Sequence, residues 1–431
     1  MPALRKPQFE RSTLNQIRLH VLPTDRYKTF AISAYIGRPL SEEEVTPTAL
    51  VPFVLRRGTD RYPDTRQFRE RLDDLYGAGF GFDIYKRGDY QIVQFRMDII
   101  NDRFVSSDEP LLEQALHFLG EVITKPVTEG DALLPKYVDA EKETLHKRIE
   151  SIVNDKIRYA AERCIAEMCK DEPYRLHPLG QLDEIADISP ESLYTHFQNW
   201  LAEAPIDLYV VGNTTLAEVE AMVKNSFRLD RETNPSYRRS TPVRRSGDTN
   251  VVVEKLPVSQ GKLNMGLRTS ITYGDDAYAA ALMYNGILGG YPHSKLFLNV
   301  RERASLAYYA SSRLDGHKGI LTIQSGIEVQ NYEQAVTIIR KQLEDMKAGV
   351  ISDIELSQTR AMISNQLREI DDSAFEQIAF DFNAVLSGRE RSVQGLIDEI
   401  NRVDISEIQQ AAVGVFLDTI YFLRDEKEEA K

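Results

Sequence analysis

The sequence predicts an α+β protein made of two homologous domains, each a mostly antiparallel sheet flanked by helices. Apolar residues recur with period 2 in some segments and with period 3.6 in others, which indicates strands and helices in one chain. The order of these segments repeats after a polar, aperiodic stretch. Paired strands next to long helices are typical of helices packed on a largely antiparallel sheet. With 431 residues, each half is long enough to form its own core.

The first half begins with strands and continues with helices. Lys86, Arg87, Gly88 and Asp89 separate two alternating segments and predict a hairpin with glycine at its turn. A later alternating segment ends at Gly212, a residue that favours a turn. The expected strands are 16–22, 28–36, 80–85, 90–99 and 206–211, and the expected helices are 110–123, 133–169, 190–201 and 216–227.

The second half repeats this order after a linker. Residues 230–249 are rich in Arg, Ser, Asn and Pro and show no periodicity, so we expect domains at 1–229 and 250–431 joined by this linker. The expected strands are 251–255, 262–269, 307–313, 319–327 and 419–424, and the expected helices are 277–288, 333–347, 354–386 and 405–416.

Two short alignments indicate that the halves arose by duplication. The sequence Arg-Glu-Arg at 69–71 recurs at 301–303, and a tyrosine follows five residues later in both places, Tyr76 and Tyr308. Asp-Ile-Ser at 187–189 likewise recurs at 404–406, ahead of an expected strand each time. A period of roughly 220–230 residues is far too long for a solenoid and indicates a duplicated domain.

Composition excludes several classes of function. The formal net charge of −13 argues against general affinity for nucleic acid or anionic membranes, which select basic surfaces. Residues 1–18 lack the apolar core of a secretory signal, and no apolar run approaches the roughly 18 residues that span a bilayer. Cys164 and Cys169 are the only cysteines and fit a reducing compartment. We expect a cytoplasmic protein without nucleic-acid or membrane partners.

Several segments resemble one family of zinc peptidases. The sequence LGGYPHSKLF at 288–297, with VRER at 300–303 and LAY at 306–308, resembles a motif of the pitrilysin, insulinase and mitochondrial processing peptidase family. HPLG at 177–180 and Gly58-Thr59 resemble two further family segments. Within the family, the pattern is most similar to the bacterial YmfF-like branch, whose members lack the metal motif. The resemblance implies two homologous α+β domains.

The metal motif of this family is degenerate here. Counted back from Gly58-Thr59, the two histidine positions of His-x-x-Glu-His fall on Ala49 and Phe53, and the glutamate position falls on Pro52. None of these side chains binds zinc or accepts a proton from water. We therefore expect no metal and no cofactor, and no catalytic residues belonging to this chain. Pro52 is also expected to kink or shorten the helix.

The position of the distal zinc ligand is altered as well. In the ungapped alignment Arg148 replaces the glutamate of this position, although a shifted register would place Glu150 there. Glu143, His146 and Glu150 share one helix face, which we interpret as a solvated surface rather than a second metal site. One hypothesis for the function of this chain is therefore an independent metallopeptidase with an unrecognised site, and two others are given below.

Arg301 and Tyr308 retain the second-domain part of the family motif. The resemblance implies that they bind the peptide backbone and stabilise the oxyanion formed during attack, roles that suit a guanidinium and a phenol. The alternative is that Arg301 forms a surface ion pair with Glu302 or Glu344 and that Tyr308 is a core residue.

Gly289 and Gly290 offer two readings of the loop that precedes this motif. The first is a flexible loop for substrate handling, and the second is an ordinary turn at the end of a helix.

These residues predict a non-catalytic subunit. We expect the chain to pair with a homologue that carries an intact zinc motif, and to contribute Arg301, Tyr308, Gly289 and Gly290 to peptide binding. The alternative is a homodimeric peptide-binding or scaffold protein without a proteolytic role.

Overall fold

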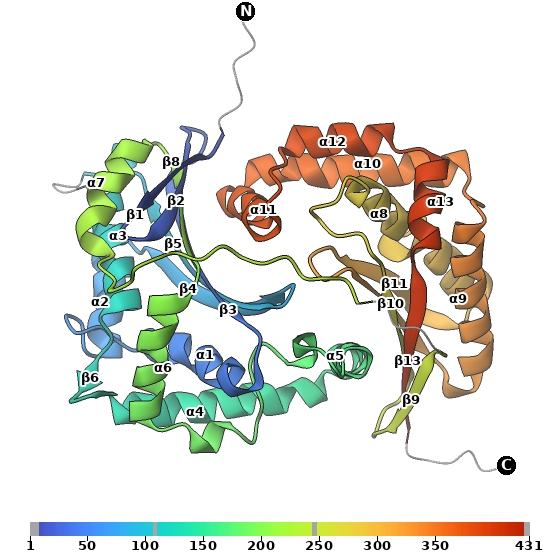
Figure 1. Ribbon diagram of the computed structural model, residues 1–431, viewed down its shortest axis with the longest axis horizontal. Helices are drawn as coiled ribbons and strands as arrows, with labels where there is room; N and C mark the ends of the chain where they lie inside the picture. The colour runs from blue at the N-terminus through green and yellow to red at the C-terminus, as the bar shows by residue number, and fades with distance from the viewer. Residues whose placement is uncertain (1–7, 107–109, 244–247, 426–431) are drawn as a thin grey trace, which may run out of the picture. The chain divides into compact units, whose positions relative to one another are not determined.

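The computed structural model describes residues 8–106, 110–243 and 248–425 (Figure 1). The chain divides into two compact units, and neither unit is continuous in sequence. The first unit comprises 1–150, 176–237 and 373–381, and the second comprises 151–175, 238–372 and 382–431.

The first unit contains a six-stranded sheet. Its order is β1-β2-β8-β3-β5-β4, in which β2 and β8 run parallel and every other neighbouring pair is antiparallel. The strands are β1 (Glu10–Leu14), β2 (Ile17–Pro23), β3 (Thr29–Pro39), β4 (Gly79–Arg87), β5 (Tyr90–Ile100) and β8 (Ile206–Gly212). The predicted hairpin is confirmed, since β4 and β5 pair antiparallel as far as Arg87 and Tyr90.

The second unit contains a five-stranded sheet of matching topology. Its order is β11-β12-β10-β13-β9, with β13 and β9 parallel and the other pairs antiparallel. Read from the other edge, this order and these directions repeat β2-β8-β3-β5-β4 of the first unit. The strands are β9 (Asn250–Lys255), β10 (Gly261–Arg268), β11 (Ala307–Asp315), β12 (Ile320–Ile327) and β13 (Phe416–Arg424). The predicted α+β class with two homologous sheets is therefore confirmed.

Helices flank both sheets (Figure 1). In the first unit they are α1 (Glu42–Leu55), α2 (Thr65–Asp74), α3 (Leu111–Thr124), α4 (Pro135–Glu150), α6 (Pro190–Glu203) and α7 (Leu216–Ser226). In the second unit they are α5 (Lys156–Met168), α8 (Tyr278–Asn285), α9 (Tyr332–Lys347), α10 (Asp353–Glu369), α12 (Val393–Arg402) and α13 (Ile405–Val413). Helix α11 (Ala374–Ser387) begins in the first unit and ends in the second. A small hairpin is formed by β6 (Thr128–Glu129) and β7 (Ala132–Leu133).

The single helix predicted at 133–169 is two helices, α4 and α5. The chain passes from the first unit to the second between Glu150 and Ser151, and α5 packs on β10 and β13 of the second sheet. The side chain of Asp155 caps the new helix by accepting hydrogen bonds from the backbone N–H groups of residues 157 and 158. Because α5 buries its apolar face in the second unit, the compact units differ from a division of the chain at 230–249.

The single helix predicted at 354–386 is also split, into α10 and α11. The chain re-enters the first unit at Ser373, and Asp381 of α11 receives two hydrogen bonds of 2.8 Å from Arg11 and one of 2.9 Å from Tyr209. Each long periodic segment thus breaks where the chain passes between units. Local periodicity does not record such a passage, because both helices of each pair keep an apolar face.

Part of the predicted linker packs on the first unit. Residues 230–243 form no helix or strand, in line with their aperiodic composition, and 244–247 lie outside the described residues. The buried guanidinium of Arg231 donates to the backbone carbonyls of Leu201 and Ala204 at the end of α6, at 3.2 and 2.7 Å. This arginine therefore satisfies carbonyl groups that a helix end leaves without partners.

No helix among the described residues is both long enough and apolar enough to cross a membrane.

Candidate functional site

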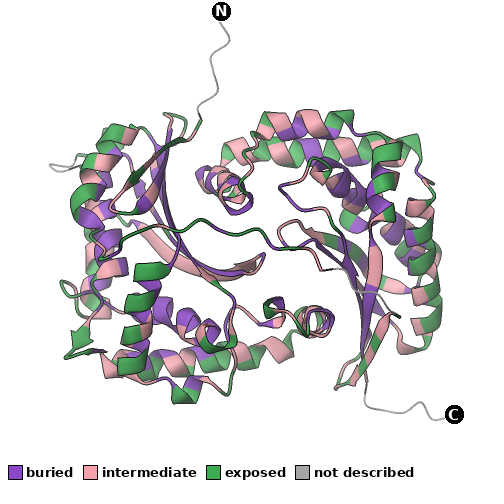
Figure 2. Ribbon diagram, in the orientation of Figure 1, coloured by how far each residue is buried: buried purple, intermediate pink, exposed green. Residues whose placement is uncertain are grey.

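The degenerate zinc positions lie on α1, a helix that is almost entirely buried (Figure 2). Ala49 is 0% exposed and Phe53 is 1% exposed. The helix contains both Pro47 and Pro52 and ends at Leu55, shortly after the second proline, which agrees with a shortened helix. These positions therefore belong to the packed core of the first unit.

Phe53 and Arg148 come together in space. The guanidinium carbon of Arg148, on α4, lies 5.6 Å from the centroid of the Phe53 ring, and that of Arg56 lies 5.4 Å from it. Phe82 of β4 packs edge-on against Phe53, with the ring centroids 5.0 Å apart. A phenylalanine and an arginine in a cation–π contact thus occupy the place where the resemblance puts a histidine and a glutamate.

The one buried carboxylate of α4, Glu141, is already neutralised. It is fully buried, accepts a hydrogen bond from Arg57 and lies 3.4 Å from a guanidinium nitrogen of Arg56. Among residues 8–106, 110–243 and 248–425, no three His, Cys, Asp or Glu side chains are grouped so as to hold a metal ion. Alkyl, phenyl and guanidinium groups are not zinc donors, so the residues at this site do not fit the metal of the family.

Arg301 lies on an exposed turn of the second unit. It belongs to the π-helix at Phe297–Arg303, and its side chain is 42% exposed. The guanidinium stacks on the Phe297 ring at 4.5 Å and lies 3.6 Å from Glu302. The structure therefore contains the Glu302 pair that the sequence suggested, whereas Glu344 pairs with Lys347 instead. An exposed pair at this distance holds the guanidinium weakly, which leaves it accessible to a ligand.

Tyr308 is a surface residue and not part of the core. It lies at an irregularity between β11 and β12, just after Ser305, whose backbone φ is +52°. The side chain is 58% exposed, and its hydroxyl donates a 2.9 Å hydrogen bond to Glu328. This hydrogen bond raises the pKa of Tyr308, so the phenol remains a neutral donor. The alternative in which Tyr308 fills the core is wrong, because the strand turns this ring outward.

Gly289 is required by close packing. It lies in the π-helix at Gly286–Gly290, and a Cβ there would lie 2.5 Å from the backbone nitrogen of Ser312 in β11. A Cβ on Gly290 would meet nothing closer than 3.3 Å, the carbonyl oxygen of Asn285. The two glycines therefore differ, and only the first has a packing reason to lack a side chain.

The residues after these glycines are fixed to α10. Tyr291 donates to Gln366 at 2.7 Å, and Lys295 pairs with Glu355 at 2.9 Å. The ring of His293 lies 2.8 Å from the hydroxyl of Thr359. This anchoring does not suit a freely flexible loop, and it positions the segment leading to Arg301 rigidly.

Sequence reasoning missed Glu328 and Gln260, which both contact Tyr308. Glu328 accepts the hydrogen bond of the phenol, and Gln260 lies close to the same hydroxyl and lowers its pKa in opposition to Glu328. Neither residue belongs to a motif. The expected strands 262–269 and 319–327 place these residues next to strand ends, but nothing in the sequence pairs the two strands.

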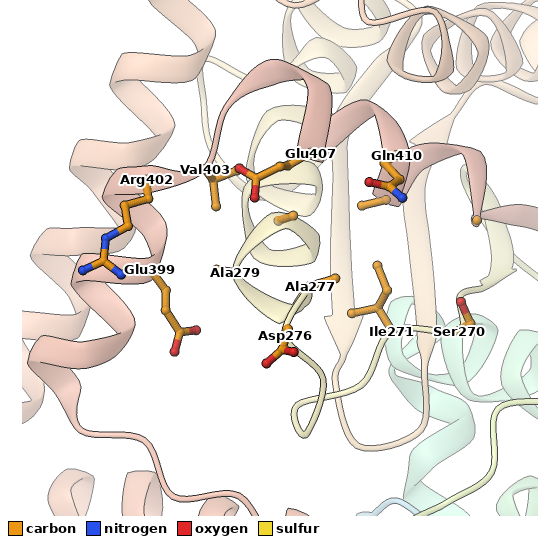
Figure 3. Close-up of a pocket in the computed structure, with 13 residues that line it drawn as sticks. Ser270, Ile271, Asp276, Ala277, Ala279, Glu399, Arg402, Val403, Glu407 and Gln410 are labelled. Carbon is orange, nitrogen blue, oxygen red and sulfur yellow. The ribbon is translucent and has the colours of Figure 1, made fainter.

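A pocket of about 570 Å³ in the second unit lies apart from all of these residues (Figure 3). It is formed by the start of α8 and by α12 and α13. Two of its carboxylates already have partners, since Asp276 pairs with Arg389 at 2.5 Å and Glu399 pairs with Arg391 at 3.3 Å.

Comparisons with known proteins agree with this picture. The family described as "Peptidase M16 inactive domain" matches residues 187–363. The chain is 40% identical over 405 residues to "Probable inactive metalloprotease YmfF" of Bacillus subtilis, which covers 94% of this chain and 95% of YmfF. It is 22% identical over 283 residues to "Uncharacterized zinc protease YmxG" of the same organism, covering 63% of this chain and 68% of YmxG.

A solved structure has the same fold over the whole chain. The crystal structure of a conserved protein from Enterococcus faecalis V583 superposes with a TM-score of 0.90 at 33% identity, covering 98% of this chain and 100% of the other. Both the sequence relatives and the fold therefore place this chain in the peptidase M16 family, the family that its motifs resemble.

Proposed function

We propose that this chain is a non-catalytic, cytoplasmic subunit that pairs with a zinc-bearing homologue and supplies peptide-binding residues to the partner's reaction. The observation that carries the proposal is a contrast between two sets of family positions. Ala49 and Phe53 are buried in a packed core, whereas Arg301 and Tyr308 are exposed and lie on an anchored segment. Selection for a peptide-binding role explains why the second set is kept free of covering side chains.

The relatives support a partner of this kind. Bacillus subtilis encodes both YmfF, named a probable inactive metalloprotease, and YmxG, named a zinc protease, and this chain is similar to both. A division of labour follows naturally from two such proteins. One chain supplies the zinc and the general base, and the other supplies groups that bind the substrate.

Arg301 and Tyr308 have complementary abilities toward a peptide. The guanidinium offers a fork of N–H donors for a carbonyl or a developing oxyanion. The Tyr308 oxygen donates its proton to Glu328, which leaves its lone pairs free to accept a peptide N–H. If the hydroxyl turned from Glu328 to a peptide carbonyl, it would donate a hydrogen bond to the substrate instead. This residue can therefore serve either side of a peptide bond.

Co-expression with the YmxG-like homologue of the same organism tests the proposal. We expect cleavage of a quenched fluorescent peptide library to require both chains. Arg301→Ala or Tyr308→Phe should lower kcat/KM by about tenfold or more, because each removes a group that binds the peptide or its oxyanion. Full activity of the zinc-bearing chain alone would overturn the proposal.

The internal repeat supplies matched controls. Arg69 and Tyr76 occupy the equivalent positions of the first half, and Tyr76 is also exposed. We expect Arg69→Ala and Tyr76→Phe to leave cleavage unchanged. A stable homodimer that binds peptide and ignores the zinc-bearing chain would instead identify the protein as a peptide-binding scaffold.

A further inference from the structure

Lys262 is a buried cation without a carboxylate partner. It lies on β10, the central strand of the second sheet, and is 9% exposed. Among the described residues, its ammonium group makes one contact, a long 3.5 Å hydrogen bond to Gln260. Burial of the ammonium lowers the pKa of Lys262, with no opposing contribution from an acid.

The other buried cations described in this unit are paired. Arg268 lies 2.7 Å from Glu172, and Lys318 lies 2.9 Å from the same carboxylate. Lys295 pairs with Glu355. Buried charges are ordinarily paired because desolvation is costly. Lys262 is therefore an exception among the buried cations described in this unit, and an anionic ligand would supply the missing partner.

An amide side chain beside Lys262 is also incompletely bonded. Asn264 follows two residues along β10 and so projects from the same face of the sheet. It is 2% exposed, and its Oδ1 accepts no hydrogen bond from any described residue. Gln324 of β12, a half-buried residue, lies directly opposite Asn264 in the strand register. The oxygen of Asn264 offers an acceptor for an N–H group.

Tyrosines of the edge strand β11 lie on the far side of β12 from Lys262. Lys262 pairs with Gly326 of β12, which in turn pairs with Tyr309 of β11. The Tyr309 ring lies over Gly326, since a Cβ there would be 2.5 Å from the ring. Gln260, the contact of Lys262, also lies close to the Tyr308 hydroxyl. The buried cation and Tyr308 of the candidate site therefore lie near one shared side chain.

We propose that Lys262 and Asn264, beside Tyr308 and Tyr309, form a subsite for a peptide carboxylate with a neighbouring N–H group. This inference rests on the proposed function and gives its substrate a chemical class. Lys262 binds the carboxylate and Asn264 accepts the N–H. A side-chain carboxylate and a C-terminal carboxylate both satisfy this chemistry, and the experiment separates them.

The test measures binding of fluorescent decapeptides to the full chain by anisotropy. One peptide is neutral with a free C-terminus, the second is amidated and contains Glu residues, and the third is neutral and amidated. We expect one of the two carboxylate peptides to bind about tenfold more tightly than the third. Lys262→Met should abolish this preference while keeping the aliphatic part of the side chain.

Lys255→Met is the matched control, because it removes the same charge from an exposed position on β9 of the same sheet. We expect it to keep the preference. Lys262→Gln serves as a second variant should the first fail to fold. Equal binding of all three peptides by the wild type would overturn the subsite and leave the proposed peptide-binding function intact.

A smaller probe tests the subsite independently of the proposed function. N-acetyl-alanyl-alanine carries one carboxylate and two N–H groups, and it should raise the thermal midpoint of the wild type but not that of Lys262→Met. The same compound with an amide in place of its C-terminal carboxylate should leave the thermal midpoint unchanged. A shift with this probe, together with full activity of the zinc-bearing chain alone, would support the subsite and overturn the proposed function. No shift and no carboxylate preference would overturn the subsite.

Discussion

The contact between α1 and α4 in the first unit and the Arg301–Tyr308 segment of the second differ from the family motif in opposite ways. In the first region, Phe53 fills the space between Phe82, Arg56 and Arg148, and none of these four side chains is a zinc donor. In the second, Tyr308 is exposed and no apolar neighbour has closed over it. A site that merely decayed would be expected to lose both regions. This difference is the one expected of the non-catalytic subunit proposed above.

The packing around Phe53 also shows why zinc binding cannot be regained by restoring the ligands alone. Three substitutions at Ala49, Pro52 and Phe53 would still leave Arg148 over the ring position. They would also place two imidazoles and a carboxylate in a helix whose buried face contacts other apolar groups. The present packing is therefore a second barrier, independent of the missing donors.

The largest effect is expected at Phe53. Phe53→Ala removes a ring that is 1% exposed and leaves a cavity under two guanidinium groups. We expect the free energy of unfolding to fall by about 3–5 kcal/mol, measured by urea denaturation. Phe53→Leu, which keeps most of the volume, should lose considerably less. A loss below about 1 kcal/mol in Phe53→Ala would mean that this region is not the rigid core that we describe.

Part of this architecture was readable from the sequence and part was not. Ala49, Pro52 and Phe53 were found because their spacing to Gly58 is local. The cation–π contact of Phe53 with Arg148 required two helices to meet, which no local pattern records. The chain crossings at 150 and 372 were missed for the same reason, since periodicity continues through both breaks.

The candidate site shows the same limit. Arg301 and Tyr308 lie close in sequence and were predictable as a pair, but their exposure was not. Lys262 gave no signal, because a lysine in a period-2 segment is ordinarily a solvated residue. Its burial follows from the central place of β10 in the sheet, a property of topology that only the fold reveals.

The second-largest effect concerns His196 of α6, whose side chain contacts Thr48 of α1. Its Nε2 lies 2.8 Å from the hydroxyl of Thr48, and burial lowers its pKa to about 4. Between this value and the ordinary value near 6.5, the unfolded chain binds the proton more readily than the folded chain does. Stability should therefore fall as the pH drops from about 6.5 toward 4, by at most about 3 kcal/mol.

His196→Gln tests this assignment, because glutamine can accept the Thr48 hydrogen bond without titrating. Urea denaturation at several pH values should show a flatter profile for the variant over this range. Glu44 and Arg38 lie near His196 and are present in both proteins, so their contributions cancel in the comparison. Identical profiles for the two proteins would contradict a buried neutral imidazole.

A smaller effect should separate the two adjacent glycines. Gly289→Ala places a methyl group 2.5 Å from the backbone of β11, so the helix and the strand must move apart. We expect a loss of about 1–3 kcal/mol, typical of overpacking. Gly290→Ala meets its nearest neighbour at 3.3 Å and should change stability by less than about 0.5 kcal/mol. Equal losses would mean that the loop, and not the contact with Ser312, requires glycine.

The smallest effect on stability is expected at Tyr308, and its smallness is informative. Tyr308→Phe removes one exposed hydrogen bond to Glu328, so the free energy of unfolding should change by less than about 1 kcal/mol. A loss comparable to that of Phe53→Ala would give Tyr308 a structural role and weaken the contrast between the two regions. A tyrosine that is nearly dispensable for folding, yet needed for cleavage by the paired chains, would assign its side chain to the substrate.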